Sequence, residues 1–396
     1  MIEQFGTPAG KKAIAALEKE GYEAVFVGGA VRDFLLGKPA KDFDIATSAE
    51  PTEVKAVFPN TVDVGIAHGT VLVLLDGEAI EVTTYRTEGT YSDHRRPDEV
   101  QFVRSLQEDL ARRDYTINAL AVTREGKLID LFGGKDDLEL GVIRAIGKAT
   151  ERFDEDALRM VRAIRFSSVL DFTIEDNTCE AIGKKKALLR HIAIERIKAE
   201  MDKLFTGINP VKAFRYAADT GLSGVLPLFP EDGAALARTA PYETASEGWA
   251  SLMAAGKFGS SEVARAYKLS NREKEFLHNV EDLMEKRGTR PYTVEDFYTY
   301  AMDVLLVCEK LLRKLAPRIE PTSFEEMERR HRELPIRSKA DLAVRGSDLI
   351  GWAGVRGGKW TGDWIQKIES AVLHGKCTND PDDIKGWFLN EFNREE

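Results

Sequence analysis

Residues 24–45 read AVFVGGAVRDFLLGKPAKDFDI, and this stretch decides the fold. Its first four residues are apolar and partly β-branched, which predicts a buried strand. Gly28 and Gly29 then allow a tight turn, and a short helix is expected to follow. The Asp-Phe-Asp sequence near the end heads a second strand. Because side chains alternate between the two faces of a strand, Asp42 and Asp44 share one face, while the phenylalanine between them points to the core.

These two strands bring together groups that suit phosphate chemistry. Backbone amides at the start of the helix can hold a phosphate, since neither glycine has a side chain in the way. Arg32 adds a fixed, forked charge. Two neighbouring carboxylates repel one another unless a cation lies between them, and hard oxygen ligands suit Mg²⁺. The combination indicates metal-assisted phosphoryl or nucleotidyl transfer, although Asp-x-Asp alone also occurs on solvated strand ends and in sugar-nucleotide glycosyltransferases.

The composition is that of a soluble globular protein with more than one domain. At 396 residues, 43% of them hydrophobic and 31% charged, the chain is expected to form two to four domains. It has no apolar run of about 20 residues and no basic start followed by an apolar stretch, so we expect neither membrane insertion nor export. Three widely spaced cysteines favour the reducing cytoplasm and argue against a zinc site.

The overall charge limits how the protein could bind RNA. A net charge of −10 counts against unspecific binding of polyanions, so RNA contact would need a local basic patch. The candidate patches are Arg112–Arg113, then Arg159 with Arg162 and Arg165, and Lys184–Lys186 with Arg190.

The rest of the first half alternates short strands with turns. Residues 71–75 and 80–84 flank Asp76-Gly77, which is a strong hairpin signal. Glu81 lies on the second of these strands, where it is equally well explained as a third acidic group beside the two aspartates or as a solvated strand residue. Residues 86–99 are polar and contain glycine and proline, so we expect a long functional loop.

Helical patterns begin near residue 105 and dominate after about residue 150. Ser105-x-x-Glu108 is a capping box for a helix that reaches Arg113 and Asp114, and Asn118 shares a face with Asp114 if that helix continues. Residues 153–169 read as one helix, with a stripe of three arginines that Asp156 leads. A solvated basic face is the bland interpretation of this stripe. Four of the five tryptophans lie in the tail, at positions 352, 360, 364 and 387, and we expect core packing there rather than stacking on RNA.

GGAVRD with DFD, then RRDYTINAL, then EDALRMVRAIRF, in this order and spacing, resemble the class II tRNA nucleotidyltransferases. These are the CCA-adding enzymes of bacteria and eukaryotes, which are related to bacterial poly(A) polymerases. The resemblance covers residues 20 to about 200, and HIAIERI at 191–197 is similar to the last motif of the family. It implies an α+β fold, in which a polymerase-β-like nucleotidyltransferase head is followed by an all-helical neck, body and tail. The expected divisions are residues 1–150, 151–205, 206–280 and 281–396, with the tail binding tRNA.

The resemblance also implies an activity and a set of site residues. The activity is template-independent addition of C, C and A to the 3′ end of tRNA from CTP and ATP, with release of pyrophosphate, in the cytoplasm and without an obligate protein partner. Asp42 and Asp44 are expected to hold two Mg²⁺ ions, with Glu81 a candidate assistant to the attacking hydroxyl. The expected nucleotide-binding residues are Gly28, Gly29, Arg32, Arg113, Asp114, Asn118, Asp156, Arg159, Arg162 and Arg165. Residues 86–99 match the flexible loop that the family ties to the switch from C to A addition.

Base selection follows from the chemistry of two of these residues. Asp156 and Arg159, three apart on the expected helix, would face the same way, one as a hydrogen-bond acceptor and the other as a donor. C and A both present an amino group beside a ring-nitrogen acceptor, which this pair fits, whereas U and G present the reverse order. The bland interpretation is an intrahelical ion pair that is indifferent to the base.

Three other functions remain open at this stage. A poly(A) polymerase, or an enzyme that adds only CC or only A, would share the motifs. A metal-dependent glycosyltransferase would explain Asp-x-Asp but not the two glycines or RRD-x-x-x-N. A non-catalytic RNA-binding protein would not need the carboxylates, which are present.

Overall fold

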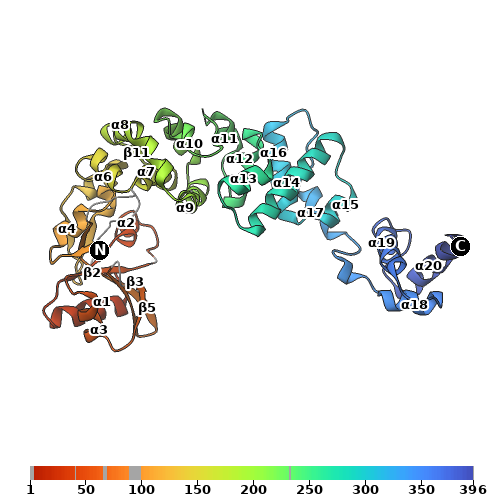
Figure 1. Cartoon of the computed structure of the whole chain (residues 1–396), viewed down its shortest axis with the longest axis horizontal. Coiled ribbons are helices and arrows are strands. Elements are labelled where there is room, and N and C mark those ends of the chain that lie inside the picture. The colour runs from red at the N-terminus through yellow and green to blue at the C-terminus, as the bar shows by residue number, and fades with distance from the viewer. Residues whose placement is uncertain (1–3, 41, 66–68, 89–99, 232, 396) are drawn as a thin grey trace. The chain divides into compact units, whose positions relative to one another are not determined.

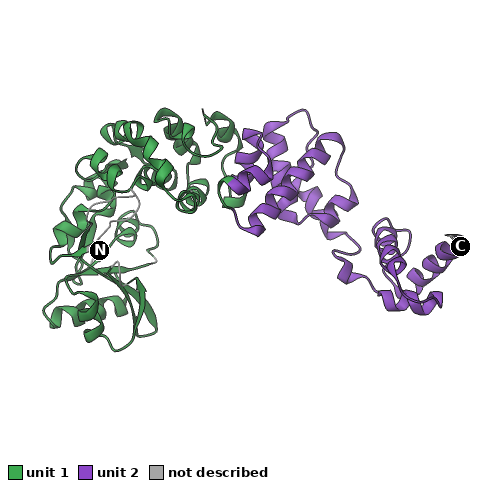
Figure 2. Ribbon diagram, viewed as in Figure 1, with its two compact units in different colours: residues 1–248, 266–268 green, residues 249–265, 269–396 purple. Residues whose placement is uncertain are grey.

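The computed structural model of the chain describes residues 4–40, 42–65, 69–88, 100–231 and 233–395 (Figure 1). The chain divides into two compact units (Figure 2). One contains residues 1–248 and 266–268, and the other contains residues 249–265 and 269–396. The expected division into four parts is finer than this and stays a prediction.

A mixed seven-stranded sheet forms the framework of the first unit. Its strands lie in the order β3, β4, β5, β2, β1, β8, β9, and all neighbouring pairs are antiparallel except β2 with β5. In this order the strands are Thr61–Gly65, Thr70–Leu75, Glu78–Thr84, Asp44–Thr47, Ala24–Val27, Leu120–Val122 and Leu128–Asp130. Helices α1 (Pro8–Lys19), α2 (Gly29–Leu35) and α3 (Pro51–Val57) belong to the same part of the chain. The expected mixed sheet with helices is therefore present.

The register between β1 and β2 sets up the site. Val27, the last residue of β1, pairs with Asp44, the first residue of β2, so the glycines that follow β1 lie beside this carboxylate. Phe43 points the other way, and its ring packs against those of Phe5 and Phe26 with centroids 5.2 and 6.1 Å apart. The alternation expected from the sequence is confirmed, although Asp42 lies just before the strand rather than in it.

The β4–β5 hairpin also forms as expected. Asp76 and Gly77 both have positive φ, 51° and 83°, which a two-residue turn of this hairpin type requires. Glu81 is exposed on β5, opposite Leu72 of β4.

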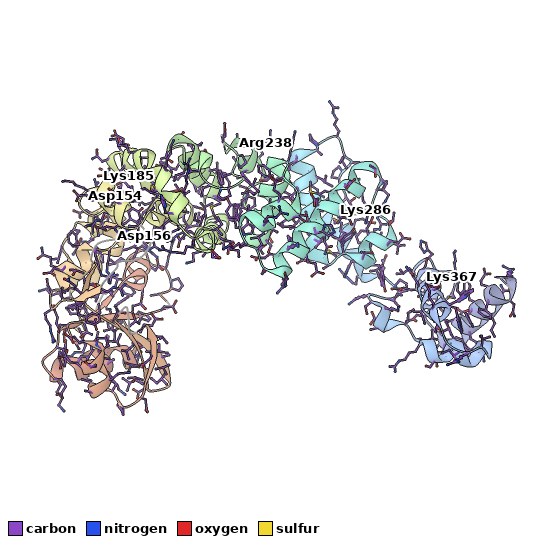
Figure 3. The ribbon with its side chains drawn as sticks, viewed as in Figure 1. Asp154, Asp156, Lys185, Arg238, Lys286 and Lys367 are labelled. Atoms are coloured by element: carbon purple, nitrogen blue, oxygen red, sulfur yellow. The ribbon has the colours of Figure 1, made fainter. Side chains whose placement is uncertain are left out.

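The remainder of the first unit is mainly helical. Short strands β6 (Arg86–Glu88) and β7 (Val100–Phe102) pair with one another, as do β10 (Val142–Ile143) and β11 (Thr173–Ile174). The helices are α4 (Leu106–Ala111), η3 (Thr116–Asn118), α5 (Gly134–Leu140), α6 (Ala149–Glu155), α7 (Leu158–Leu170), α8 (Asp176–Lys185), η4 (Lys186–His191), α9 (Ile194–Phe205), α10 (Pro210–Asp219), η5 (Leu222–Gly224) and α11 (Ala234–Thr239). Lys185 of α8 donates to both carboxylate oxygens of Asp154 of α6 at 2.7 Å, and this ion pair joins the two helices (Figure 3).

Two expected helices differ from the sequence interpretation. Residues 153–169 do not form one helix, because α6 ends at Glu155 and α7 begins at Leu158. Asp156 is extended, with φ −136° and ψ 103°, and its Oδ1 accepts from the backbone amide of Leu158 at 3.0 Å. Aspartate often ends one helix and caps the next in this way, since its carboxylate satisfies a free amide. Similarly, the helix that Ser105 caps ends at Ala111 and does not continue to Asn118.

The second unit is helical and has its own aromatic core. Its helices are α12 (Ala245–Gly256, which begins in the first unit), α13 (Ser260–Ala266), α14 (Asn271–Thr289), α15 (Val294–Thr299), α16 (Met302–Leu315), α17 (Phe324–Arg332), η6 (Lys339–Asp341), α18 (Gly346–Ala353), α19 (Lys359–Leu373) and α20 (Pro381–Glu395). Trp364 is buried and meets Phe388 edge-on at 5.2 Å, and the other three tail tryptophans pack partly buried against the same cluster. The expected core role of these tryptophans is confirmed. Among the described helices, none is both long and apolar enough to cross a membrane.

Candidate active site

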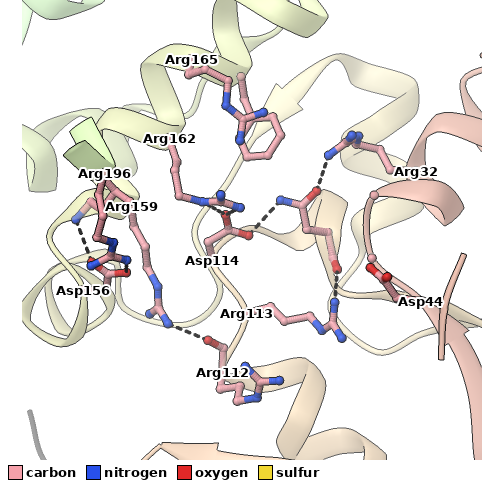
Figure 4. Close-up of a pocket in the computed structure, with 15 residues that line it drawn as sticks. Arg32, Asp44, Arg112, Arg113, Asp114, Asp156, Arg159, Arg162, Arg165 and Arg196 are labelled. Atoms are coloured by element: carbon pink, nitrogen blue, oxygen red, sulfur yellow. Dashed lines mark hydrogen bonds and ion pairs between the residues drawn. The ribbon is translucent and has the colours of Figure 1, made fainter. Parts of the chain in front are cut away.

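One cavity of about 470 Å³ gathers most of the expected site residues (Figure 4). This volume lies within the range of about 300–1,000 Å³ that is usual for small-molecule sites. The expected residues that line it are Gly28, Gly29, Arg32, Asp44, Arg113, Asp114, Asn118, Asp156, Arg159, Arg162 and Arg165. They come from the β1–α2 turn and α2, from β2, from the segment after α4, and from Asp156 and α7, so the fold brings distant motifs together.

The cavity is strongly basic. Seven arginines line it, against three carboxylates, namely Asp44, Asp114 and Asp156. Such a surface suits a ligand with several negative charges, because guanidinium groups bind phosphates through two parallel hydrogen bonds.

The β1–α2 turn leaves room beside a carboxylate. Gly28 has a φ of 84°, which side chains disfavour, and a Cβ there would lie 3.4 Å from Oδ2 of Asp44 and 3.7 Å from Nη1 of Arg113. Glycine therefore keeps open the space between the turn, the carboxylate and the guanidinium, as the sequence interpretation requires.

A chain of hydrogen bonds crosses the cavity wall. Nη1 of Arg32 donates to Oδ1 of Asn118 at 2.7 Å, and Nδ2 of Asn118 donates to Oδ1 of Asp114 at 2.9 Å. The other oxygen of Asp114 accepts from Nε of Arg162 at 2.7 Å. Burial alone would raise the pKa of Asp114, but Arg162 and Asn118 outweigh it and lower this pKa to about 2. Asp114 and Asn118 thus meet as expected, by way of a turn and not of a continued helix.

The arginines of α7 are not a solvated basic face. Arg159 and Arg165 are only 6% and 8% exposed, and each has a defined partner. Arg159 binds Oε2 of Glu155 at 2.6 Å and the backbone oxygen of Arg112 at 2.8 Å. Because long charged side chains are rarely buried unless they are paired, these arginines are held in place by specific partners and do not form a solvated surface.

Asp156 and Arg159 both line the cavity, but not by sharing a helix face. Asp156 precedes α7, and its Oδ2 accepts from Nη2 of Arg196 in α9 at 2.6 Å. The expectation of one helical face is therefore wrong, and so is the basis of the intrahelical ion-pair interpretation. Both side chains still line the same cavity, Asp156 from the segment before α7 and Arg159 from α7 itself.

The three candidate catalytic carboxylates lie around a neighbouring cavity of about 310 Å³. Asp42, Asp44 and Glu81 line it, and Asp44 is shared with the arginine cavity. Burial and the charge of Glu81 raise the pKa of Asp44 to about 6, with Asp42 adding to this shift and Arg113 opposing it. The negative charge here is incompletely balanced, and a divalent cation would balance it.

Sequence reasoning missed several residues of this site. Arg112, Arg196, Leu158 and Phe166 also line the arginine cavity. Arg112 was named only as part of a candidate basic patch, and Leu158 and Phe166 lie inside EDALRMVRAIRF and Arg196 inside HIAIERI, motifs in which these three residues were given no role. The loop expected at 86–99 is wrong for its first three residues, which form strand β6 because they pair with β7, and from residue 89 onward it lies outside the described residues.

Comparison with known proteins decides the family. A CCA-adding enzyme of Bacillus cereus is 42% identical over 380 residues, which cover 94% of this chain and 96% of that protein. The chain belongs to the CCA-adding enzyme family. A crystal structure of the Bacillus stearothermophilus CCA-adding enzyme in complex with CTP is 37% identical, covers 98% of this chain and 99% of that one, and superimposes with a TM-score of 0.86. The Thermotoga maritima CCA-adding enzyme complexed with tRNA, at 22% identity, 99% and 97% coverage and a TM-score of 0.68, shares the fold.

Family models match three consecutive parts of the chain. The model described as "Poly A polymerase head domain" matches residues 24–144, the one described as "Probable RNA and SrmB- binding site of polymerase A" matches residues 171–231, and the one described as "tRNA nucleotidyltransferase domain 2 putative" matches residues 241–388. Membership of this family confirms the expected nucleotidyltransferase fold, and nucleotidyltransferases of this kind generally use divalent metal ions. It excludes the alternatives of a glycosyltransferase and of a non-catalytic RNA-binding protein.

Proposed function

We propose that this protein adds C, C and A to the 3′ end of tRNA, using CTP and ATP and releasing pyrophosphate. The observation that carries the proposal is the arginine cavity that ends at Asp44. A triphosphate lies among the guanidinium groups and the Gly28–Gly29 turn, which places its α-phosphate toward the carboxylates. The tRNA 3′-hydroxyl then attacks from the side of Asp42 and Glu81. The cytoplasm, where tRNA, CTP and ATP occur together, is the compartment in which we propose it works.

The donor set at the carboxylates suits two Mg²⁺ ions. Mg²⁺ usually takes one or two protein carboxylates and completes its octahedral shell with phosphate oxygens and water. In the part of the chain that the structure describes, no three His, Cys, Asp or Glu side chains form a ready metal site, so substrate oxygens would complete the shell of each ion. Asp42 and Asp44 would hold the ions, which when bound stabilise the attacking and leaving oxygens. Glu81 is exposed beside them and would orient the hydroxyl.

Asp156 and Arg159 would read the base at the other end of the cavity. Each Asp156 oxygen already accepts one hydrogen bond, from Leu158 or from Arg196, and a carboxylate oxygen can accept another. Arg159 is fixed by Glu155 and by backbone oxygens, so its guanidinium group has a defined direction. A rigid acceptor and a rigid donor fit the amino group and ring nitrogen that C and A share.

The direct test is incorporation into defined RNA. Purified protein is incubated with tRNA lacking CCA, with tRNA ending in C, and with tRNA ending in CC, each with one labelled nucleotide. We expect C on the first two substrates, A on the third, and no U or G. Incorporation that stops after CC would instead indicate an enzyme that adds only CC. Incorporation that occurs only on tRNA ending in CC would indicate an enzyme that adds only A.

A second candidate is poly(A) polymerase, favoured by the two polymerase A models that match residues 24–144 and 171–231. The same assay separates the two functions. With ATP alone and an RNA unrelated to tRNA, a poly(A) polymerase makes long tails, whereas the proposed enzyme adds at most one A to tRNA ending in CC.

Removing either carboxylate tests the chemistry. We expect Asp42→Ala and Asp44→Ala to slow nucleotide addition by about 1,000-fold or more, because transition-state charge loses its stabilisation. Affinity for tRNA should change little. Asp63→Ala is the matched control, since Asp63 is an exposed acid on β3 that pairs with Lys55. Wild-type rates in either site variant would refute the metal assignment.

A further inference from the structure

Glu200 of α9 does not line the arginine cavity, but it holds two arginines that do. Its side chain is buried, and its Oε2 accepts from Nε of Arg165 at 2.8 Å. Its Oε1 accepts from Nη1 of Arg162 at 3.5 Å, a longer contact. One carboxylate behind the wall therefore faces two adjacent guanidinium groups.

The ring of Phe166 shows which end of the cavity these arginines serve. The guanidinium of Arg165 lies 3.5 Å from the ring centroid, and those of Arg32 and Arg162 lie 5.2 and 5.5 Å from it. Arg32 lies beside the glycine turn, since its Nη2 would lie 3.5 Å from a Cβ at Gly29. The cluster around Phe166 is thus at the phosphate end and not at Asp156, whose partner is Arg196.

We propose that Glu200 is a positioning residue, which holds Arg165 and Arg162 in the direction that binds the triphosphate of the incoming nucleotide. The proposal rests on the proposed function, because it takes the cavity to bind CTP and ATP. The guanidinium groups of Arg162 and Arg165 both contact Glu200, and the buried carboxylate offsets the repulsion between their two positive charges. Burial and the charge of Arg162 lower the pKa of Arg165 in spite of Glu200, which agrees with this crowding of positive charge.

A purely structural role makes a different prediction. Glu200 also joins α9 to α7, and a variant that only loosened this contact would weaken binding of every ligand of the cavity alike. If Glu200 instead acts through Arg165 and Arg162, its loss weakens binding more for a nucleotide that carries more phosphates. The number of phosphates on the ligand therefore separates the two roles.

The experiment compares CTP, CDP and CMP binding to the full chain without tRNA. Glu200→Gln removes the charge and keeps the shape. We expect it to weaken CTP binding by about tenfold, the value of one charge-assisted hydrogen bond, with a smaller loss for CDP and none for CMP. Asp202→Asn is the matched control, because Asp202 lies on the same helix and pairs with Lys198 at 2.9 Å. Glu200→Asp keeps the charge and should retain more CTP affinity than Glu200→Gln.

Three results would overturn the proposal. They are unchanged CTP binding in Glu200→Gln, an equal loss for CTP and CMP, or the same loss in Asp202→Asn. Urea melts report whether the variants fold, and if Glu200→Gln does not, Glu200→Asp and Asp202→Glu are compared by the same CTP-to-CMP criterion. Failure of the wild type to bind CTP would refute the proposed function itself, and it is seen before any variant is made.

Discussion

Each arginine of the cavity has an acidic partner, so the guanidinium groups are in place before any ligand arrives. The pairs are Arg112 and Arg113 with Asp109, Arg159 with Glu155, Arg162 with Asp114, Arg165 with Glu200, Arg196 with Asp156, and Arg32 with Asp33. A site that is fixed in advance loses less entropy on binding and responds less to solvent during reaction. The acidic partners therefore help to define the site as much as the arginines that they hold.

Asp114 should make the stability of the protein depend on pH. Its pKa is about 2 in the folded chain, against an ordinary value of 3.8. A lowered pKa stabilises the fold above the ordinary value, and this contribution is lost as the pH falls from about 4 toward 2. By linkage it amounts to about 2 kcal/mol at neutral pH. We expect Asp114→Asn to lower the free energy of unfolding at pH 7. The difference in this free energy between variant and wild type should be smaller at pH 3. A difference in unfolding free energy that is the same at pH 7 and pH 3 would contradict the lowered pKa of Asp114.

Asp156 and Arg159 should control which bases are added. Asp156→Asn keeps an oxygen to cap Leu158 but gains a donor, so UTP and GTP incorporation should rise relative to CTP and ATP. Arg159→Ala should also reduce the preference for CTP and ATP over UTP and GTP, since each mismatched contact to a base costs on the order of 1–3 kcal/mol. Rates with all four nucleotides are the measurement, and Asp154→Asn, at an acid that pairs with Lys185, is the control. A uniform fall for all four nucleotides would argue against base reading.

At the scale of elements, the sequence predicts strands and turns better than helix ends. The β1–α2 turn and the Asp76-Gly77 hairpin have local chemical causes, namely glycine and positive φ, and both were predictable. The break between α6 and α7 was not, because the apolar spacing continues across it and only the cap at Asp156 shows the interruption. Arg196 and Glu200 reach the site through packing of α9 on α7, which no local pattern encodes.

The pairing of β6 with β7 suggests how to test the segment that follows β6. Arg86 pairs with Phe102 and Thr87 with Gln101, so the two ends of the segment are joined by backbone hydrogen bonds. A deletion of residues 89–95 can therefore be closed without disturbing the sheet. We expect it to leave C addition largely intact and to stop A addition, measured on tRNA lacking CCA and on tRNA ending in CC. An equal loss of both steps would make the segment structural.

At the scale of the whole molecule, all residues assigned to the chemistry lie in the first unit. The end of the second unit has its own core, formed by α18, α19 and α20 around Trp364. Removing residues 334–396 should therefore leave CTP affinity unchanged and weaken tRNA binding, if the tail holds tRNA as we expect. Titrations with CTP and with tRNA check the two halves of this prediction separately. Loss of CTP affinity would show that the units depend on one another.

The excess of arginine over carboxylate in the cavity also governs what happens after the bond is made. In the proposed reaction, pyrophosphate leaves with most of the negative charge of the triphosphate, while the guanidinium groups proposed to bind it stay in place. If the guanidinium groups bind the triphosphate as we propose, escape of pyrophosphate is opposed by the same attraction that favoured entry of the nucleotide, and dissolved salt screens that attraction. On the proposed function, we therefore expect release of pyrophosphate to limit turnover, and added pyrophosphate to favour the reverse reaction.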